Sequence, residues 1–225
     1  MGKLLDIKGK IPKKHPIIEI IGNIDIGKTP VAQLVARRLK ATYIPFPVLD
    51  PTSLTGRGLL TTLTQNAREL ERNPHWWSHI YSANMYEQVS RIEEANEAGP
   101  VVVTNYTMAY RMWMKTLGVN IENFTAHLPE PNVAYVLYGE QIVPTSRPIF
   151  NFSSEYIQKI KRNVAVINDP RVKKLVLSDF YSLYRHVYVN NICVAITTNV
   201  KEKYGCYVDE KELYSLNSFI MKKDG

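Results

Sequence analysis

The sequence predicts an α/β fold, a parallel five-stranded sheet with helices on both faces. Two observations support this prediction. Short apolar, β-branched runs alternate along the chain with longer segments whose apolar residues recur at helical spacing. The first such run, IIEII at 17–21, leads through a glycine-containing loop into a helical segment. Continuous apolar runs are typical of parallel strands that are buried on both faces.

The first half of the chain alternates between strand and helix signals. After the glycine loop, the apolar residues of 31–39 recur at helical spacing, and Pro30 falls in a first turn, where proline is tolerated. Residues 42–46 are expected to form the second strand. Two longer helices are then expected, at 56–70 and 75–98. A Gly-Pro pair directly after the second helix is a normal stop signal.

The second half continues this alternation. The remaining strands are expected at 101–104, 133–138 and 175–177. The remaining helices are expected at 108–117, 153–168 and 179–189. Gly118 follows the first of these helices directly, so we expect it to end that helix as its C-cap residue.

The composition fits one globular domain with short extensions. The chain has 225 residues, of which 45% are hydrophobic and 22% charged. No apolar run reaches the roughly 18 residues that a membrane span needs. We expect a basic leader at 1–16, a main domain at 17–190 and a C-terminal extension at 191–225.

Charge and cysteine content narrow the class of protein further. The formal net charge is +7, and residues 1–14 hold five lysines against one aspartate. We expect this leader to be a solvated end, with nucleic-acid association as a weaker alternative. It lacks the apolar core of a secretory signal. Cys193 and Cys206 are the two cysteines, too few for a four-cysteine metal site and consistent with reduced thiols in the cytoplasm.

The glycine loop carries the most specific motif. Residues 22–29, GNIDIGKT, match the phosphate-loop pattern G-x4-G-K-[ST]. In such a loop, backbone N–H groups and the following helix N-terminus bind phosphates. Lys28 is predicted to reach the β- and γ-phosphates of ATP, and the Thr29 hydroxyl to bind Mg²⁺. The predicted nucleotide-binding residues are Gly22, Asn23, Ile24, Asp25, Ile26, Gly27, Lys28 and Thr29. The expected fold is therefore that of P-loop NTPases.

Four further segments resemble thymidylate kinase, including the divergent versions of large DNA viruses. They are Phe46-Pro47 with Thr55-Gly56 after it, YSANMYEQV at 81–89, VVVTNY at 101–106 and LPEPNVAYVLY at 128–138. The resemblance covers roughly residues 17–189. It implies transfer of a phosphoryl group from ATP to dTMP with Mg²⁺ as cofactor. It also implies a homodimer, and no membrane partner is expected.

One face of the helix at 75–98 is the candidate acceptor site. Tyr81, Asn84, Met85 and Gln88 follow the spacing i, i+3, i+4, i+7 and so share this face. An aromatic ring and two amides suit stacking on a base and reading its edge, although a buried core stripe would have the same spacing. The resemblance favours the substrate face. It adds Phe46, Arg57 and Tyr106 to the predicted substrate-binding residues.

Several charged residues of the resembled family are replaced here. Its acids before and within the loop fall at Ile21 and Ile24, and its Asp-Arg pair at Thr104-Asn105. Met85 stands where the family has arginine. Other basic residues are candidates to replace these charges, namely Arg57, Arg111, Arg147, Lys161 and Arg162. Arg147, in a candidate lid at 140–152, is predicted to be catalytic together with Lys28.

Two alternatives follow from the same residues. The missing charges are consistent with a catalytically degraded protein of this fold that only binds nucleotides. The loop sequence Gly22-Asn23-Ile24 resembles deoxynucleoside kinases more than thymidylate kinases, but Thr104-Asn105-Tyr106 does not match the E-R-S motif of those enzymes. Both families share the architecture, so the predicted fold is the same.

Overall fold

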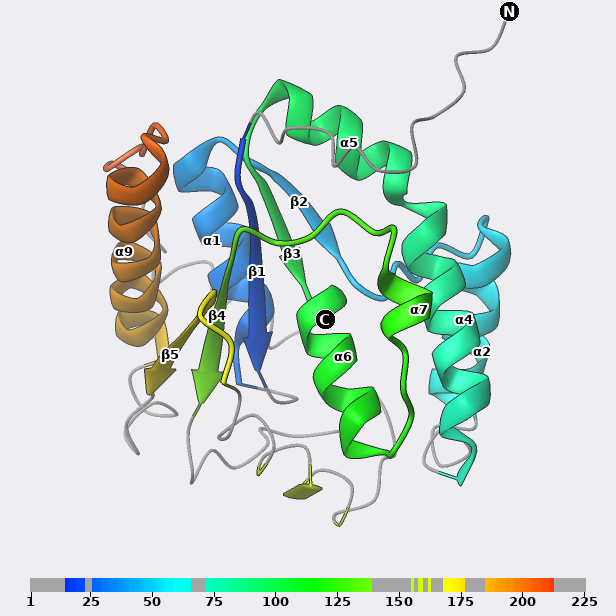
Figure 1. Cartoon of the computed structure of the whole chain (residues 1–225). Helices are drawn as coiled ribbons and strands as arrows, with labels where there is room; N and C mark the ends of the chain where they lie inside the picture. The colour runs from blue at the N-terminus through cyan, green and yellow to red at the C-terminus, as the bar shows by residue number, and fades with distance from the viewer. Residues whose placement is uncertain are drawn as a thin grey trace, which may run out of the picture.

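A parallel sheet forms the centre of the structure, which is a computed structural model. The structure describes residues 15–22, 26–65, 72–138, 155, 158–159, 162, 168–176 and 185–212. Within these residues five strands pair in parallel in the order β2-β3-β1-β4-β5 (Figure 1). They are β1 (Ile17–Gly22), β2 (Thr42–Pro45), β3 (Val101–Thr104), β4 (Val133–Tyr138) and β5 (Val172–Val176). The predicted fold class is confirmed.

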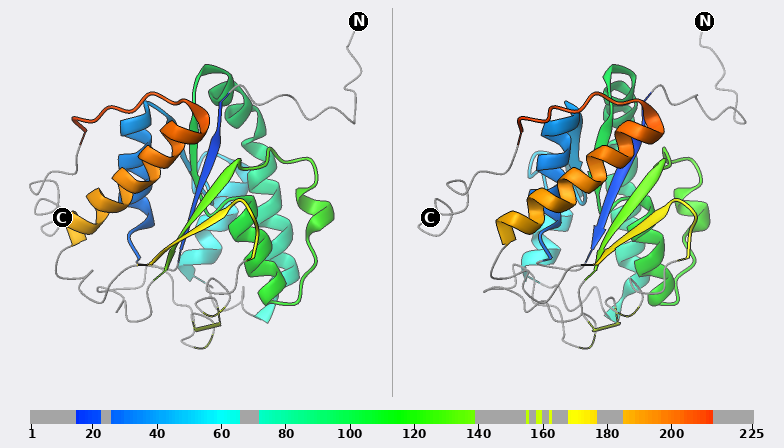
Figure 2. Two further views of the ribbon diagram at one scale, coloured as in Figure 1. Left: turned by 60° about the vertical axis from the view of Figure 1, so that its left-hand side comes forward. Right: turned by 90° about the vertical axis from the view of Figure 1, so that its left-hand side faces the viewer.

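Helices cover both faces of the sheet. On one face lie α1 (Lys28–Leu39) and α9 (Arg185–Tyr204), which pack against each other (Figure 2). On the other face α6 (Thr107–Thr116) follows β3. The remaining helices are α2 (Leu54–Gln65), α4 (Pro74–Glu87), α5 (Val89–Ala98) and the short α7 (Glu122–Thr125). Each face of the sheet is therefore buried, as the continuous apolar runs require.

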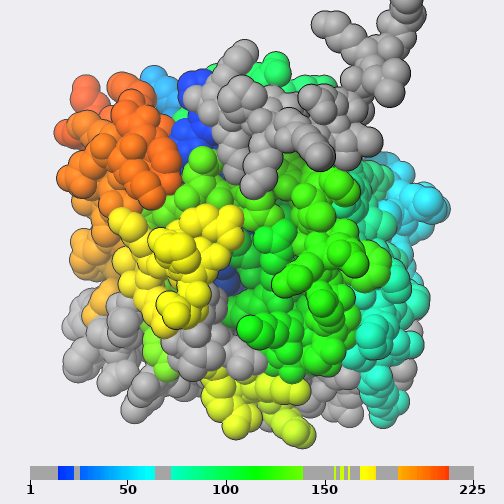
Figure 3. Space-filling view, in the orientation of Figure 1, coloured from blue at the N-terminus to red at the C-terminus, as the bar shows by residue number. Residues whose placement is uncertain are grey.

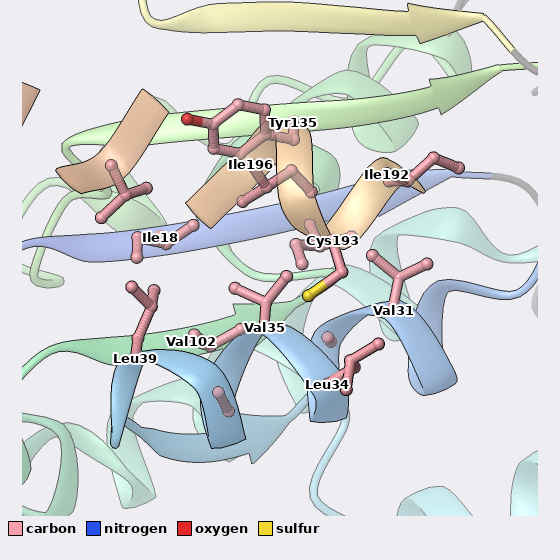
Figure 4. Close-up of a cluster of buried hydrophobic side chains, with 14 of the residues drawn as sticks. Ile18, Val31, Leu34, Val35, Leu39, Val102, Tyr135, Ile192, Cys193 and Ile196 are labelled. Atoms are coloured by element: carbon pink, nitrogen blue, oxygen red, sulfur yellow. The ribbon is translucent and has the colours of Figure 1, made fainter. Parts of the chain in front are cut away.

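Alternate side chains of β1 point to opposite faces of the sheet. Ile18 and Ile20 belong to the core cluster beneath α1 and α9, in which Val35, Cys193 and Ile196 interdigitate (Figure 4). Ile17 and Ile21 belong instead to clusters on the α6 face, with residues of α4 and α6 among their neighbours. This alternation places consecutive residues of the strand under different helices.

Three predicted elements differ from the structure. The helix expected at 75–98 is two helices, because Gln88 leaves the helical conformation (φ −99°, ψ 0°) and its N–H bonds the carbonyls of Met85 and Tyr86. The strand expected at 175–177 begins at Val172 in the structure. Its start could not be predicted because the exposed pair Lys173-Lys174 interrupts the apolar signal of this edge strand. The helix expected at 179–189 is described from Arg185 and extends to Tyr204.

The last of these differences bears on the domain limits. Helix α9 continues through residue 190, where we predicted that the main domain ends. Its buried residues, Val189, Cys193, Ile196 and Val200, pack in the core beneath α1. The division of the chain at 16 and 190 stays a prediction.

One further expectation differs from the structure, and others agree with it or lie outside it. Gly118 has a positive φ of +76° and lies one residue beyond Leu117, which is the C-cap of α6 in place of the predicted Gly118. The leader at 1–14 and most of the helix expected at 153–168 lie outside the described residues. Among the residues that are described, no helix is long and apolar enough to span a membrane.

Candidate functional site

The two glycines of the phosphate loop are required by its geometry. A Cβ atom on Gly22 would lie 2.8 Å from the Ile26 side chain and 3.0 Å from the Leu137 carbonyl oxygen. Gly27 has φ +84°, in the left-handed region that favours glycine. The backbone therefore approaches its neighbours more closely than any side chain would allow. Three predicted loop residues, Asn23, Ile24 and Asp25, lie outside the described part of the chain.

Helix α1 begins directly at this loop with an open N-terminus. Gly27 is its N-cap residue, so no side chain caps the first backbone N–H groups, and its first turn contains no acid. These N–H groups and the positive end of the helix suit an anion. Lys28 is half-buried in the first turn, and Thr29 is exposed. Both residues lie in the first turn of α1, and their roles in binding a phosphate and Mg²⁺ stay predictions.

Three hydroxyl groups lie together beside the start of α1. The Tyr43 hydroxyl, on β2, lies 3.4 Å from the Thr104 hydroxyl at the end of β3. The Thr29 side chain lies near enough to lower the pKa of the Tyr43 hydroxyl, against the larger effect of burial. Burial raises the pKa of Tyr43, so the phenol stays neutral. Sequence reasoning missed Tyr43, because it lies in a short strand without a motif.

A buried carboxylate connects β1 to helix α6. Glu19 has no exposed surface and accepts hydrogen bonds of 3.0 Å from the backbone N–H groups of Met108 and Ala109. The N-cap residue of α6, Tyr106, makes no side-chain cap bond, so Glu19 supplies the cap from another element. Burial raises the pKa of Glu19 to about 7. In the sequence Glu19 stands inside the apolar run at 17–21, and no motif there indicates its role.

Asn84 of the predicted acceptor face is buried and bonded within the protein. Its Oδ1 accepts the N–H of Val48 at 2.8 Å. Its Nδ2 donates to the Val48 carbonyl at 3.1 Å and to the Thr55 hydroxyl at 3.0 Å. Asn84 therefore fixes the segment after β2 against α4. This is the bonding expected of a core stripe, so a role for Asn84 in reading a base stays a prediction.

The aromatic residues of the predicted site come together at the ends of β2 and β3. The rings of Phe46 and Tyr106 lie 4.8 Å apart. The Tyr81 ring stacks on Tyr110 at 4.9 Å, and its hydroxyl donates to the Asn105 carbonyl at 2.6 Å. All four rings are buried. Their contact with a nucleotide is therefore still a prediction.

The turn between β3 and α6 holds polar atoms that lack partners. Asn105 has φ +53°, which is uncommon outside glycine. Its Oδ1, the Tyr106 hydroxyl and the Thr107 hydroxyl are buried, and none has a hydrogen-bond partner among the described residues. Buried polar atoms usually have hydrogen-bond partners, so the lack of partners sets this turn apart from the rest of the candidate acceptor site.

The remaining predicted residues that the structure describes contact other parts of the protein. Met85 is buried, and Gln88 accepts a hydrogen bond from Arg91 at 3.4 Å. Arg57 donates from Nε to the Pro51 carbonyl at 3.0 Å. Arg111, a candidate replacement for a missing charge, forms an ion pair with Glu130 instead. Arg147 and Lys161 lie outside the described residues.

Comparison with solved structures supports the fold. The structure is similar to thymidylate kinase from Candida albicans, with a TM-score of 0.56 and 16% sequence identity over 80% of this chain and 93% of that one. It is also similar to deoxyadenosine kinase from M. mycoides with bound dATP, with a TM-score of 0.54 and 11% identity over 82% and 98% of the two chains. Neither a family model nor a curated protein matches the sequence. The chain thus has the P-loop kinase fold at low sequence identity to both enzymes.

Proposed function

We propose that this chain is a nucleotide kinase that transfers the γ-phosphoryl group of ATP to a nucleoside monophosphate, with dTMP as the substrate. One observation carries the proposal. Helix α1 begins at Lys28 with an uncapped, acid-free N-terminus, directly after a loop in which a Cβ atom on Gly22 would clash and Gly27 has a positive φ. This arrangement suits the phosphates of a nucleoside triphosphate.

The residues of the loop fit ATP with Mg²⁺. Bound Mg²⁺ would neutralise charge on the β- and γ-phosphates. The exposed Thr29 hydroxyl would hold the metal, and the neighbouring Tyr43 hydroxyl would orient it. Lys28 and Arg147 would stabilise the charge on the transferred group. Because phosphoryl transfer needs mainly positioning and charge stabilisation, these roles do not require a covalent intermediate.

The acceptor would lie near the ends of β2 and β3. Phe46 and Tyr106 meet there, and the β3–α6 turn holds three buried polar atoms that have no hydrogen-bond partner among the described residues. Binding of the monophosphate would require some opening of these buried groups. The resemblance to thymidylate kinase favours dTMP, and it also favours a homodimer, which light scattering would test.

A deoxynucleoside kinase is the second candidate. The structural similarity to a deoxyadenosine kinase and the G-N-I loop support it. The two candidates differ in the acceptor, which is a phosphate oxygen in one and a sugar hydroxyl in the other. The same assay therefore distinguishes them.

The test is a coupled assay of ADP release with ATP, Mg²⁺ and each nucleoside monophosphate or deoxynucleoside in turn. Turnover with dTMP that is lost in Lys28→Ala supports the proposal. Turnover with deoxynucleosides only would support the second candidate. If folded protein binds ATP in calorimetry but releases no ADP with any acceptor, the chain is a nucleotide-binding protein and the proposed kinase activity is wrong.

A further inference from the structure

A groove lies on the α6 face of the sheet, and two of the candidate replacement charges, Arg111 and Arg162, line it. It has a volume of about 880 Å³ and separates α6 from the segment that leads into β5. Figure 3 shows these two parts facing each other across a depression, with β1 at its floor. The floor is apolar and consists of Ile21, Met108, Met112 and Val172. This volume is in the range of small-molecule sites.

Basic side chains dominate the walls of the groove. Among the described residues five line it, namely Arg111, Lys115, Lys159, Arg162 and Arg171. The acidic lining residues are Glu155 and Asp169. Lys115 is exposed on α6, and Lys159 and Arg162 are exposed on the opposite wall. None of these three forms an ion pair within the described residues.

Two arginines of the groove are held in fixed positions. Glu130 forms ion pairs with both Arg111 and Arg171, the latter at 2.9 Å. Arg171 also binds Asp169 at 2.9 Å, and Arg111 donates to the Thr125 hydroxyl at 2.8 Å. Their side chains nevertheless stay 31% and 35% exposed. Guanidinium groups that are fixed before binding lose little conformational freedom when an anion arrives.

The groove and helix α1, which follows the phosphate loop, lie on opposite faces of the sheet. Ile21 points into the groove, whereas Ile20, one residue earlier, packs beneath α1. Helix α1, which begins with Lys28, lies on the face away from the groove. A ligand in the groove would therefore not contact the backbone N–H groups that begin α1.

We propose that this groove is a second binding site, which takes an organic phosphate with an apolar body. The phosphate would lie against Lys115, Lys159 and Arg162, and the apolar body would cover Met108 and Met112. The net positive charge of the walls selects an anion, and the apolar floor discriminates against inorganic phosphate. This site is independent of the proposed kinase activity.

Naphthyl phosphate is a suitable probe, and Lys28→Ala is the suitable background because it removes binding at the phosphate loop. The chain is labelled with ¹³C at the methionine methyl groups and titrated by NMR. We expect saturable shifts at Met108 and Met112, with a dissociation constant on the order of 1 mM. Met85 and Met114, which are buried away from the groove, should stay unchanged. Inorganic phosphate should bind at least about tenfold more weakly.

Two charge reversals and a matched control complete the experiment. Lys115→Glu and Arg162→Glu should each raise the dissociation constant about tenfold. Lys173→Glu makes the same charge change at an exposed residue next to Val172 but on the other side of β5, so it should change the constant less than about twofold. Absence of saturable shifts at Met108 and Met112, or equal effects of the three reversals in folded protein, would overturn the proposal.

Discussion

Replacing Glu19 with glutamine is expected to change how the stability of the protein depends on pH. The carboxylate has no exposed surface and accepts two backbone hydrogen bonds from the first turn of α6. Burial raises its pKa from 4.5 to about 7, although the bonds from Ala109 and Met108 act in the opposite direction. Burial therefore destabilises the charged form of Glu19 more than the two hydrogen bonds stabilise it.

The sign of the effect follows from proton binding. Between pH 4.5 and 7 the folded chain keeps the Glu19 proton that the unfolded chain releases. The free energy of unfolding therefore falls as pH rises through this window. Each pKa unit corresponds to about 1.4 kcal/mol, so the contribution above pH 7 is a loss of about 3 kcal/mol. Below pH 4.5 this loss is absent.

Glu19→Gln removes the charge and keeps the shape of the side chain. One amide oxygen can still accept an N–H, but the amide nitrogen faces the other N–H, at a cost of about 1–3 kcal/mol. The variant should therefore be less stable than the parent at pH 5. Above pH 7 the two effects offset each other, so the two proteins should be of similar stability.

Urea unfolding of both proteins at pH 5, 6, 7 and 8 measures this difference. Glu97→Gln is the matched control, because Glu97 is an exposed glutamate on α5. We expect the gap between parent and Glu19→Gln to narrow by up to about 3 kcal/mol with rising pH. Parallel pH profiles for the two proteins would refute the reasoning, since they would mean that Glu19 does not titrate in this window.

Three further substitutions test the site. Gly22→Ala should abolish ATP binding in calorimetry and lower stability by about 1–3 kcal/mol, because its Cβ has no room; unchanged binding would contradict this account of the loop. Asn84→Ala should destabilise the fold by about 2–4 kcal/mol in urea unfolding, because it leaves both backbone groups of Val48 unpaired; a loss below 1 kcal/mol would argue against it. Tyr43→Phe should weaken ATP binding with Mg²⁺ more than without it, because Thr29 loses a neighbouring hydroxyl that would orient it. Equal losses in both conditions would exclude a role at the metal.

The fold could be predicted from the sequence because its strands are continuous apolar runs. The strand predicted at 133–138 has those limits in the structure, and the one at 101–104 likewise. The break at Gln88 could not be predicted, because the helical spacing of apolar residues continues across it. The edge strand β5 was misplaced because Lys173 and Lys174 interrupt its apolar signal.

The candidate site was harder to predict than the fold. The phosphate loop is local, because its whole motif lies within the consecutive residues 22–29. Glu19 depends on Met108 and Ala109, which are 89 and 90 residues away, and no sequence pattern indicates that contact. The spacing of Tyr81 and Asn84 gave their shared face correctly, but spacing does not distinguish a face that meets a ligand from one that meets the segment after β2.

The most direct test of the proposed function is ADP release from ATP in the presence of Mg²⁺ and dTMP, measured for the parent chain and for Lys28→Ala. We predict turnover by the parent that requires both Mg²⁺ and the nucleoside monophosphate, and a loss of at least about 100-fold in the variant. Folded parent protein that releases no ADP under these conditions, whether or not it binds ATP, would contradict the proposed function.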